Sequence, residues 1–78
     1  MSAKLDEMWA ALEAHKPKRK YAEAWRVMCR ERTADAAADA GRAAESAGFF
    51  SAMSAAYSTA WAVRYAQRAI DAIEEVKP

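Results

Sequence analysis

The stretch that decides the fold is residues 49–76, which reads FFSAMSAAYSTAWAVRYAQRAIDAIEEV. It contains no proline or glycine, is rich in alanine and is longer than an average helix, so it predicts one long α-helix. At about 100° per residue, its bulky side chains fall into two adjacent arcs of that helix. We expect the first arc to face the core, and it consists of Phe49, Met53, Ala56, Ala60, Val63 and Ile70.

The second arc combines aromatic rings with arginines, and it consists of Phe50, Tyr57, Trp61, Arg64, Tyr65 and Arg68. Tryptophan, tyrosine and arginine are the residue types that carry most of the binding energy in protein interfaces. We therefore predict a partner-binding surface anchored by Tyr57, Trp61, Arg64, Tyr65 and Arg68. The sequence does not distinguish three alternatives for what packs on this arc: the chain's own Trp9 and Trp25, a second copy in a homodimer, or a foreign protein.

The rest of the chain also reads as helical. Residues 3–15 form an amphipathic stretch that ends before Pro17, and a second helix is predicted from about Lys18. Alanine dominates residues 33–47, which allows close approach of a neighbouring helix. We favour one continuous or slightly kinked helix over residues 18–47, with a break capped by Thr33 as the alternative. Gly48 is expected to end this region.

These patterns predict an all-α fold in one domain, residues 1–78. The architecture is a small antiparallel helical bundle of three helices, or of four if the chain breaks near Thr33. A chain of 78 residues buries a core of marginal size, so a partner or a second copy would add stability.

Charge is unevenly distributed although the formal net charge is only +1. Residues 16–32 carry seven basic side chains against the two acidic ones of Glu23 and Glu31. This asymmetry predicts either steering toward an acidic protein surface or contact with nucleic-acid phosphates. The alternative is a solvated helix face on which the two glutamates pair with neighbouring arginines. The candidate residues are Lys16, Lys18, Arg19, Lys20, Arg26 and Arg30.

Catalytic chemistry has little support in the sequence. A nucleophile–base pair would need the fold to bring the single histidine, His15, to the single cysteine, Cys29. We expect instead that His15 caps a helix end and that Cys29 packs as a small apolar residue. One histidine and one cysteine do not make a four-ligand zinc site, and no glycine-rich phosphate loop occurs. The prediction is a protein without enzymatic activity, metal or cofactor.

Cellular location is predicted from three features. A single cysteine excludes an internal disulfide and fits a reducing compartment. The first residues lack the apolar run of a secretion signal. Residues 46–63 are uncharged and approach the length of a membrane span, but they contain several serine and threonine residues and fit a buried helix better. We expect a cytoplasmic protein without a membrane partner.

The run from Tyr57 to Ala69, together with YAEAWR from Tyr21 and the alanine–acid stretch at 34–47, resembles small Ala/Trp-rich helical proteins of phages, prophages and bacterial immunity loci. The resemblance is compositional and covers about residues 21–72. It implies a bacterial or phage origin, a cytoplasmic site of action in a bacterial host cell, and a role in blocking another protein. Anti-CRISPR inhibitors are among the proteins of this kind. The charge pattern here departs from the strongly acidic inhibitors that mimic DNA.

The function predicted from the sequence is a non-catalytic protein–protein interaction module, in the form of a phage-encoded inhibitor that binds and blocks a host defence protein. The alternative is a small nucleic-acid-binding protein that uses the basic segment from Lys16 to Arg30.

Overall fold

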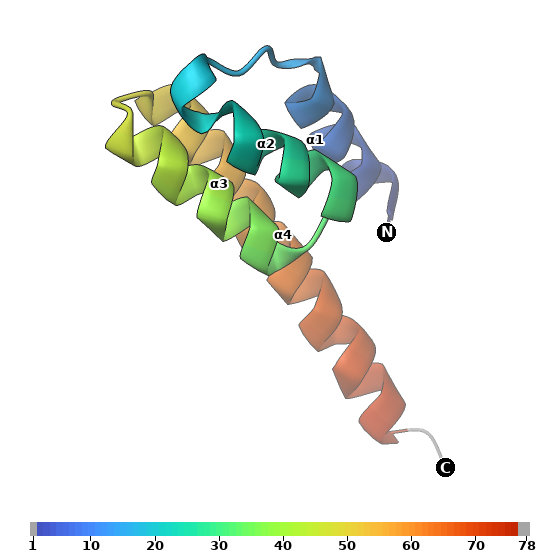
Figure 1. The fold of residues 1–78 in the computed structure, drawn as a ribbon. Helices are drawn as coiled ribbons and strands as arrows, with labels where there is room; N and C mark the ends of the chain where they lie inside the picture. The colour runs from blue at the N-terminus through green and yellow to red at the C-terminus, as the bar shows by residue number, and fades with distance from the viewer. Residues whose placement is uncertain (1, 77–78) are drawn as a thin grey trace.

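The computed structural model describes the backbone of residues 2–76 and the side chains of residues 5–75. The fold is all-helical, as predicted, and no strand occurs in this part of the chain. Four helices follow one another along the chain (Figure 1): α1 (Ser2–Ala14), α2 (Arg19–Glu31), α3 (Ala34–Ser46) and α4 (Phe50–Val76). Of the two predicted helix counts, four is correct.

The favoured continuous helix over residues 18–47 is wrong, because the chain breaks between α2 and α3. Arg32 adopts a left-handed conformation with φ 54°, and its N–H still donates to the carbonyl of Met28 at 2.8 Å. Thr33 then takes an extended conformation, and its Oγ1 accepts from the N–H of Ala36 at 3.1 Å. Arg32 therefore ends α2 and the Thr33 side chain caps the start of α3, so the two segments form separate helices.

The predicted turn at Gly48 is confirmed. Gly48 has a φ of 85°, a left-handed conformation that glycine adopts without a Cβ penalty. Its N–H donates to the carbonyl of Glu45 at 3.0 Å, and the N–H of Phe49 donates to the carbonyl of Ala44 at 2.9 Å. These two bonds form a Schellman motif, which ends α3 and turns the chain so that α4 lies alongside it (Figure 1).

The core combines bulky side chains from the first two helices with small ones from the last two. Trp9 and Leu12 of α1 and Tyr21, Trp25 and Met28 of α2 are all buried. They pack against alanines of α3 and α4, which include Ala36, Ala37, Ala40, Ala44, Ala52, Ala56 and Ala60. Because alanine side chains are short, α3 and α4 approach closely, and the volume of the core comes from the aromatic rings of α1 and α2.

The whole molecule measures 49 × 21 × 18 Å along its principal axes, and the fourth helix extends well beyond the other three (Figure 1). At 1.5 Å per residue, the 13 residues of α3 span about 20 Å, and the 27 residues of α4 span about 40 Å. The prediction that Ile70 faces the core is therefore wrong. Its side chain is 41% exposed, because α3 has no residue left to cover that part of α4.

None of the helices in the described part of the chain combines the length and apolar character that crossing a membrane requires.

Candidate protein-binding surface

The five predicted anchor side chains line one cavity on the flank of α4. Its volume is about 260 Å³, and Ala38 of α3 and Ala60 of α4 complete its lining. We call Tyr57, Trp61, Arg64, Tyr65 and Arg68 the aromatic–arginine surface. Helical spacing of three and four residues places these side chains on one face, as the sequence predicted. Ala38 was not predicted, because its position depends on how α3 packs against α4.

Two large rings of this surface are left in solvent. Trp61 is 60% exposed and Tyr65 is 58% exposed. Their rings stack on each other, with centroids 5.3 Å apart and planes 25° from parallel. This pair forms a preorganised aromatic platform, because each ring restricts the rotamers of the other.

Trp9 and Trp25 do not cover the platform, so that alternative is wrong. Trp9 is only 4% exposed and Trp25 only 2%, and both belong to the core. The indole Nε1–H of Trp25 donates to the carbonyl of Leu12 at 2.9 Å, which joins α2 to the end of α1. Burying these two indoles in the core leaves the outer face of α4 without an aromatic neighbour from the first two helices.

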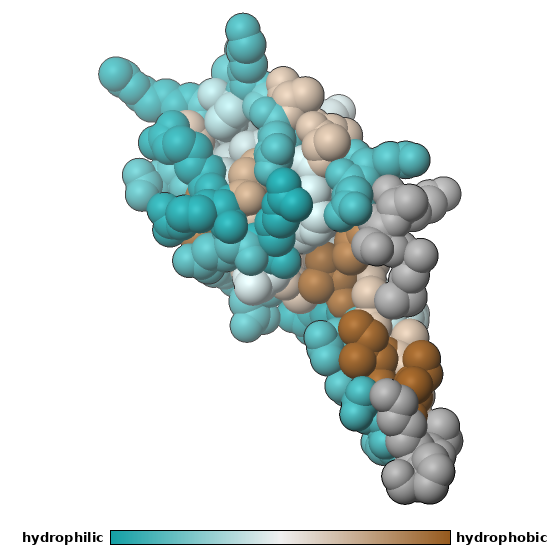
Figure 2. All heavy atoms as spheres, turned by 90° about the vertical axis from the view of Figure 1, so that its right-hand side faces the viewer, coloured by the Kyte–Doolittle hydropathy of each residue, from teal (hydrophilic) through white to brown (hydrophobic). Residues whose placement is uncertain are grey.

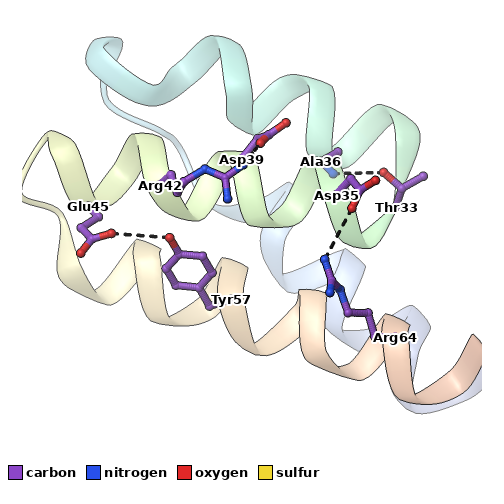
Figure 3. A network of polar contacts seen from close by, with 8 residues as sticks. All are labelled: Thr33, Asp35, Ala36, Asp39, Arg42, Glu45, Tyr57 and Arg64. Atoms are coloured by element: carbon purple, nitrogen blue, oxygen red, sulfur yellow. Dashed lines mark hydrogen bonds and ion pairs between the residues drawn. The ribbon is translucent and has the colours of Figure 1, made fainter. Parts of the chain in front are cut away.

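Tyr57 is the half-buried member of the surface. Its ring lies against the backbone of Gly41 in α3, at a place where a Cβ on Gly41 would lie 2.8 Å from its Cε1. Its hydroxyl donates to Oε1 of Glu45 at 3.5 Å (Figure 3). Tyr57 thus packs within the protein and also lines the cavity, and the other aromatic anchors stand beside it toward the free end of α4.

The two arginines of the surface differ in their pairing. Nη2 of Arg64 lies 3.5 Å from Oδ1 of Asp35, across the α3–α4 contact (Figure 3). Both side chains are largely exposed, so the pair contributes at most about 1 kcal/mol and can exchange partners readily. Arg68 has no ion pair with any described residue. Both arginines also line a neighbouring open cavity of about 590 Å³ with Arg32 and Val63.

The predicted basic residues lie elsewhere, on the α1–α2 connection and along α2. All six are exposed, and none lines the 260 Å³ cavity. Arg26 pairs with Glu23 at 3.7 Å, and Arg30 pairs with Glu31 at 3.6 Å, so local pairing accounts for these two. Within the described part of the chain no ion pair engages Lys16, Lys18, Arg19 and Lys20.

His15 and Cys29 both line an open cavity of about 410 Å³, together with Trp25. His15 is held by the hydroxyl of Tyr21, 2.7 Å from its Nε2. Burial raises the pKa of the Cys29 thiol, the nearby Glu13 carboxylate raises it further, and Arg32 opposes the change. A raised pKa keeps the thiol protonated near neutral pH, which is the opposite of what an activated cysteine nucleophile requires.

Among the described residues no group of three or more histidine, cysteine, aspartate or glutamate side chains is arranged to hold a metal ion.

Comparison with protein-family models, with curated proteins and with solved structures finds no match.

Proposed function

We propose that this protein is a non-catalytic protein–protein interaction module whose aromatic–arginine surface binds an acidic segment of a partner protein. One observation carries the proposal: Trp61 and Tyr65 are more than half exposed, stacked, and placed beside Arg64 and Arg68 around one cavity. An aromatic platform next to cationic side chains is the composition of an interface hot spot. The cavity would accept one large apolar side chain of the partner.

The chemistry of the partner follows from the charges around the platform. Arg64 and Arg68 offer guanidinium groups that bind carboxylates with two parallel hydrogen bonds. Burying the exposed part of Trp61 would contribute about 3 kcal/mol, on the basis of about 25 cal/mol per Å² of apolar surface. We infer an acidic peptide segment with a large apolar residue, and the exposed basic residues of α2 would steer it by long-range attraction.

We further propose that the protein is a phage-encoded inhibitor that blocks a host defence protein in the cytoplasm of a bacterial cell. The resemblance to small Ala/Trp-rich phage and immunity proteins supports this role. We also propose an antiparallel bundle. The contacts of Asp35 with Arg64 and of Glu45 with Tyr57 support this arrangement for α3 and α4.

The test uses a displayed library of random peptides selected against the immobilised full chain. Wild type is expected to enrich peptides in which aspartate or glutamate flanks a large apolar residue. Trp61→Ala and Arg68→Glu should lose these peptides, because they remove the platform and one guanidinium. Phe50→Ala is the matched control: Phe50 is 62% exposed on the same helix but does not line the cavity.

Circular dichroism and urea unfolding of each variant accompany the selection. Loss of peptide binding in Phe50→Ala as well would contradict the proposal. If Trp61→Ala instead unfolds the chain, Trp61 is a core residue and its assignment as an anchor is wrong.

A second candidate function is nucleic-acid binding through the basic segment, favoured by the four exposed cations that lack an ion pair among the described residues. Affinity for duplex and single-stranded DNA would fall steeply with salt, because bound phosphates release counterions. Substitution of Lys18, Arg19 and Lys20 by glutamine should reduce that salt dependence. Absence of salt-sensitive binding rules this function out.

A further inference from the structure

The face of α4 that carries the aromatic–arginine surface continues onto the part of the helix that extends beyond the bundle. Asp71 lies seven residues after Arg64. Glu75 lies seven residues after Arg68. Seven residues make about two helical turns, so both carboxylates lie on the same side of α4 as the two guanidinium groups. Figure 2 shows hydrophilic side chains along one edge of the extension and hydrophobic ones beside them. The aromatic–arginine face thus has a basic first half and an acidic second half.

Both signs of charge on this face are accessible. All side chains described from Gln67 to Glu75 are exposed. Among the described residues, Arg68 and Glu75 have no ion pair. The Asp71 carboxylate accepts a hydrogen bond from Nε2 of Gln67 at 3.0 Å, which leaves its second oxygen exposed. The charged groups of this face can therefore pair with another molecule.

The order of the charges is complementary to itself. In an antiparallel pair of α4 helices centred between residues 69 and 70, Arg64 lies opposite Glu75 of the second copy. In the same pair, Arg68 lies opposite Asp71 of the second copy. The twofold axis repeats both contacts, so opposite charges meet at every charged position of the face. Parallel copies would place arginine beside arginine and carboxylate beside carboxylate. The charge order therefore favours a second copy, in antiparallel orientation.

Side-chain size on this face is complementary as well. Ala72 lies seven residues after Tyr65 and eleven after Trp61, so this small residue shares the side of α4 that carries the aromatic platform. The antiparallel pair brings Ala72 of the second copy beside the Tyr65 ring. A small residue next to a large ring allows two helix axes to approach closely. The pair would thus cover part of the two rings, which are more than half exposed in the single chain.

The bundles leave room for this pair. The contact uses residues 64–75 of each α4, whereas the other three helices pack on the earlier part of α4 (Figure 1). The start of α3 lies beside the start of the contact, where Asp35 pairs with Arg64. In an antiparallel pair the two bundles therefore lie at opposite ends of the joined helices.

We infer that two copies of this chain associate as an antiparallel pair in which the acidic half of each α4 covers the aromatic–arginine surface of the other copy. The inference rests on the proposed function, because it names the chain's own segment from Asp71 to Glu75 as a ligand of the same surface. Exposed ion pairs are individually weak and the contact is small, so the population of dimer rises with concentration. An acidic segment of a foreign partner must displace the second copy, so dimerisation regulates partner binding.

The first test is sedimentation equilibrium of the full chain at low salt and rising concentration. Wild type should shift from monomer to dimer. One variant combines Arg64→Glu with Arg68→Glu, and the other combines Asp71→Lys with Glu75→Lys. Each variant alone should have a dissociation constant at least about tenfold higher than wild type, because like charges then face each other. An equimolar mixture of the two variants should dimerise again, since it restores opposite charges at every position.

Ile70→Gln is the matched control. Ile70 is 41% exposed on the same segment, but nine residues separate it from Trp61, which corresponds to about 180° around the helix. Its substitution should leave the dissociation constant unchanged, and loss of the dimer in this variant would overturn the inference. All the substituted side chains are exposed, and circular dichroism at low concentration verifies that each variant is folded.

The second test addresses orientation by oxidative crosslinking in a Cys29→Ser background. A mixture of the Arg64→Cys and Glu75→Cys chains should form a disulfide-linked heterodimer, which keeps the reciprocal Arg64–Glu75 pair. Each chain alone should crosslink poorly. Efficient crosslinking of Glu75→Cys with itself would indicate parallel helices and overturn the proposed arrangement.

Failure of the inference differs from failure of the proposed function. A wild-type monomer at every concentration up to about 1 mM would overturn the inference, and so would a mixture of the two charge-reversed variants that stays monomeric. Enrichment of acidic peptides by a monomeric wild type would leave the proposed function standing. A dimer that behaves as expected, with no peptide enriched, would support the inference and contradict the proposed function.

Discussion

Gly41 shows how a single residue sets the distance between two helices. In α3 it stands opposite Tyr57 of α4, and the ring occupies the space that a side chain would need. Glycine lowers helix stability by about 1 kcal/mol relative to alanine, but here it admits an aromatic ring against the backbone. The same contact holds Tyr57 in the lining of the candidate binding cavity.

Gly41→Ala is expected to destabilise the protein by about 1 kcal/mol, because the new methyl group would overlap the Tyr57 ring and outweigh the gain in helix propensity. In a Tyr57→Ala background the same change should instead stabilise the protein by about 1 kcal/mol. Urea unfolding of the four variants in a double-mutant cycle measures both effects. An equal effect of Gly41→Ala in the two backgrounds would show that the ring does not restrict this position.

At the scale of elements, the junction between α2 and α3 sets the relative direction of the two helices and so determines which of their side chains face the core. The left-handed Arg32 and the Thr33 cap change the direction of the chain, so the aromatic face of α2 and the alanine face of α3 both point inward. Nη2 of Arg32 also lies 2.5 Å from Oε2 of Glu13, and this exposed ion pair links α1 to the junction.

Thr33→Ala is expected to lower the free energy of unfolding by about 1 kcal/mol, because it removes the acceptor for the Ala36 N–H at the start of α3. Thr33→Ser keeps a hydroxyl at the same position and should stay close to wild type. Urea unfolding followed by circular dichroism compares the two. Greater stability of Thr33→Ala than of wild type would mean that a continuous helix is preferred at this junction.

The whole molecule consists of a four-helix core and a solvated extension of α4 (Figure 1). A chain ended after Arg68 should have a free energy of unfolding within about 1 kcal/mol of that of the full chain at low protein concentration, because every side chain described beyond it is exposed.

Trp25→Ala, in contrast, should lower the free energy of unfolding by about 3–5 kcal/mol through loss of a buried indole. Urea unfolding of both at the same concentration checks the comparison. A large loss on truncation would show that the extension belongs to the cooperative core.

Several residues show which features of the fold and of the candidate surface could be predicted from the sequence. Alanine content and the lack of glycine within residues 49–76 predicted a long helix, and the left-handed tolerance of Gly48 predicted its start. The five anchor residues were grouped correctly on one face, because helical periodicity alone places them there. The sequence did not predict which residues cover that face, because tryptophans such as Trp9 and Trp25 occur both in cores and at surfaces.

The local chemistry of the chain determined its helical class, the turn at Gly48, and the shared face of the aromatic–arginine residues, because these depend on contacts a few residues apart. Only the tertiary structure decided that the chain breaks at Arg32, that Trp9 and Trp25 are buried while Trp61 is not, and that Ile70 lies beyond the bundle. These outcomes depend on how far each helix runs beside its neighbours. That overlap is set by packing between residues distant in sequence, which periodicity does not encode.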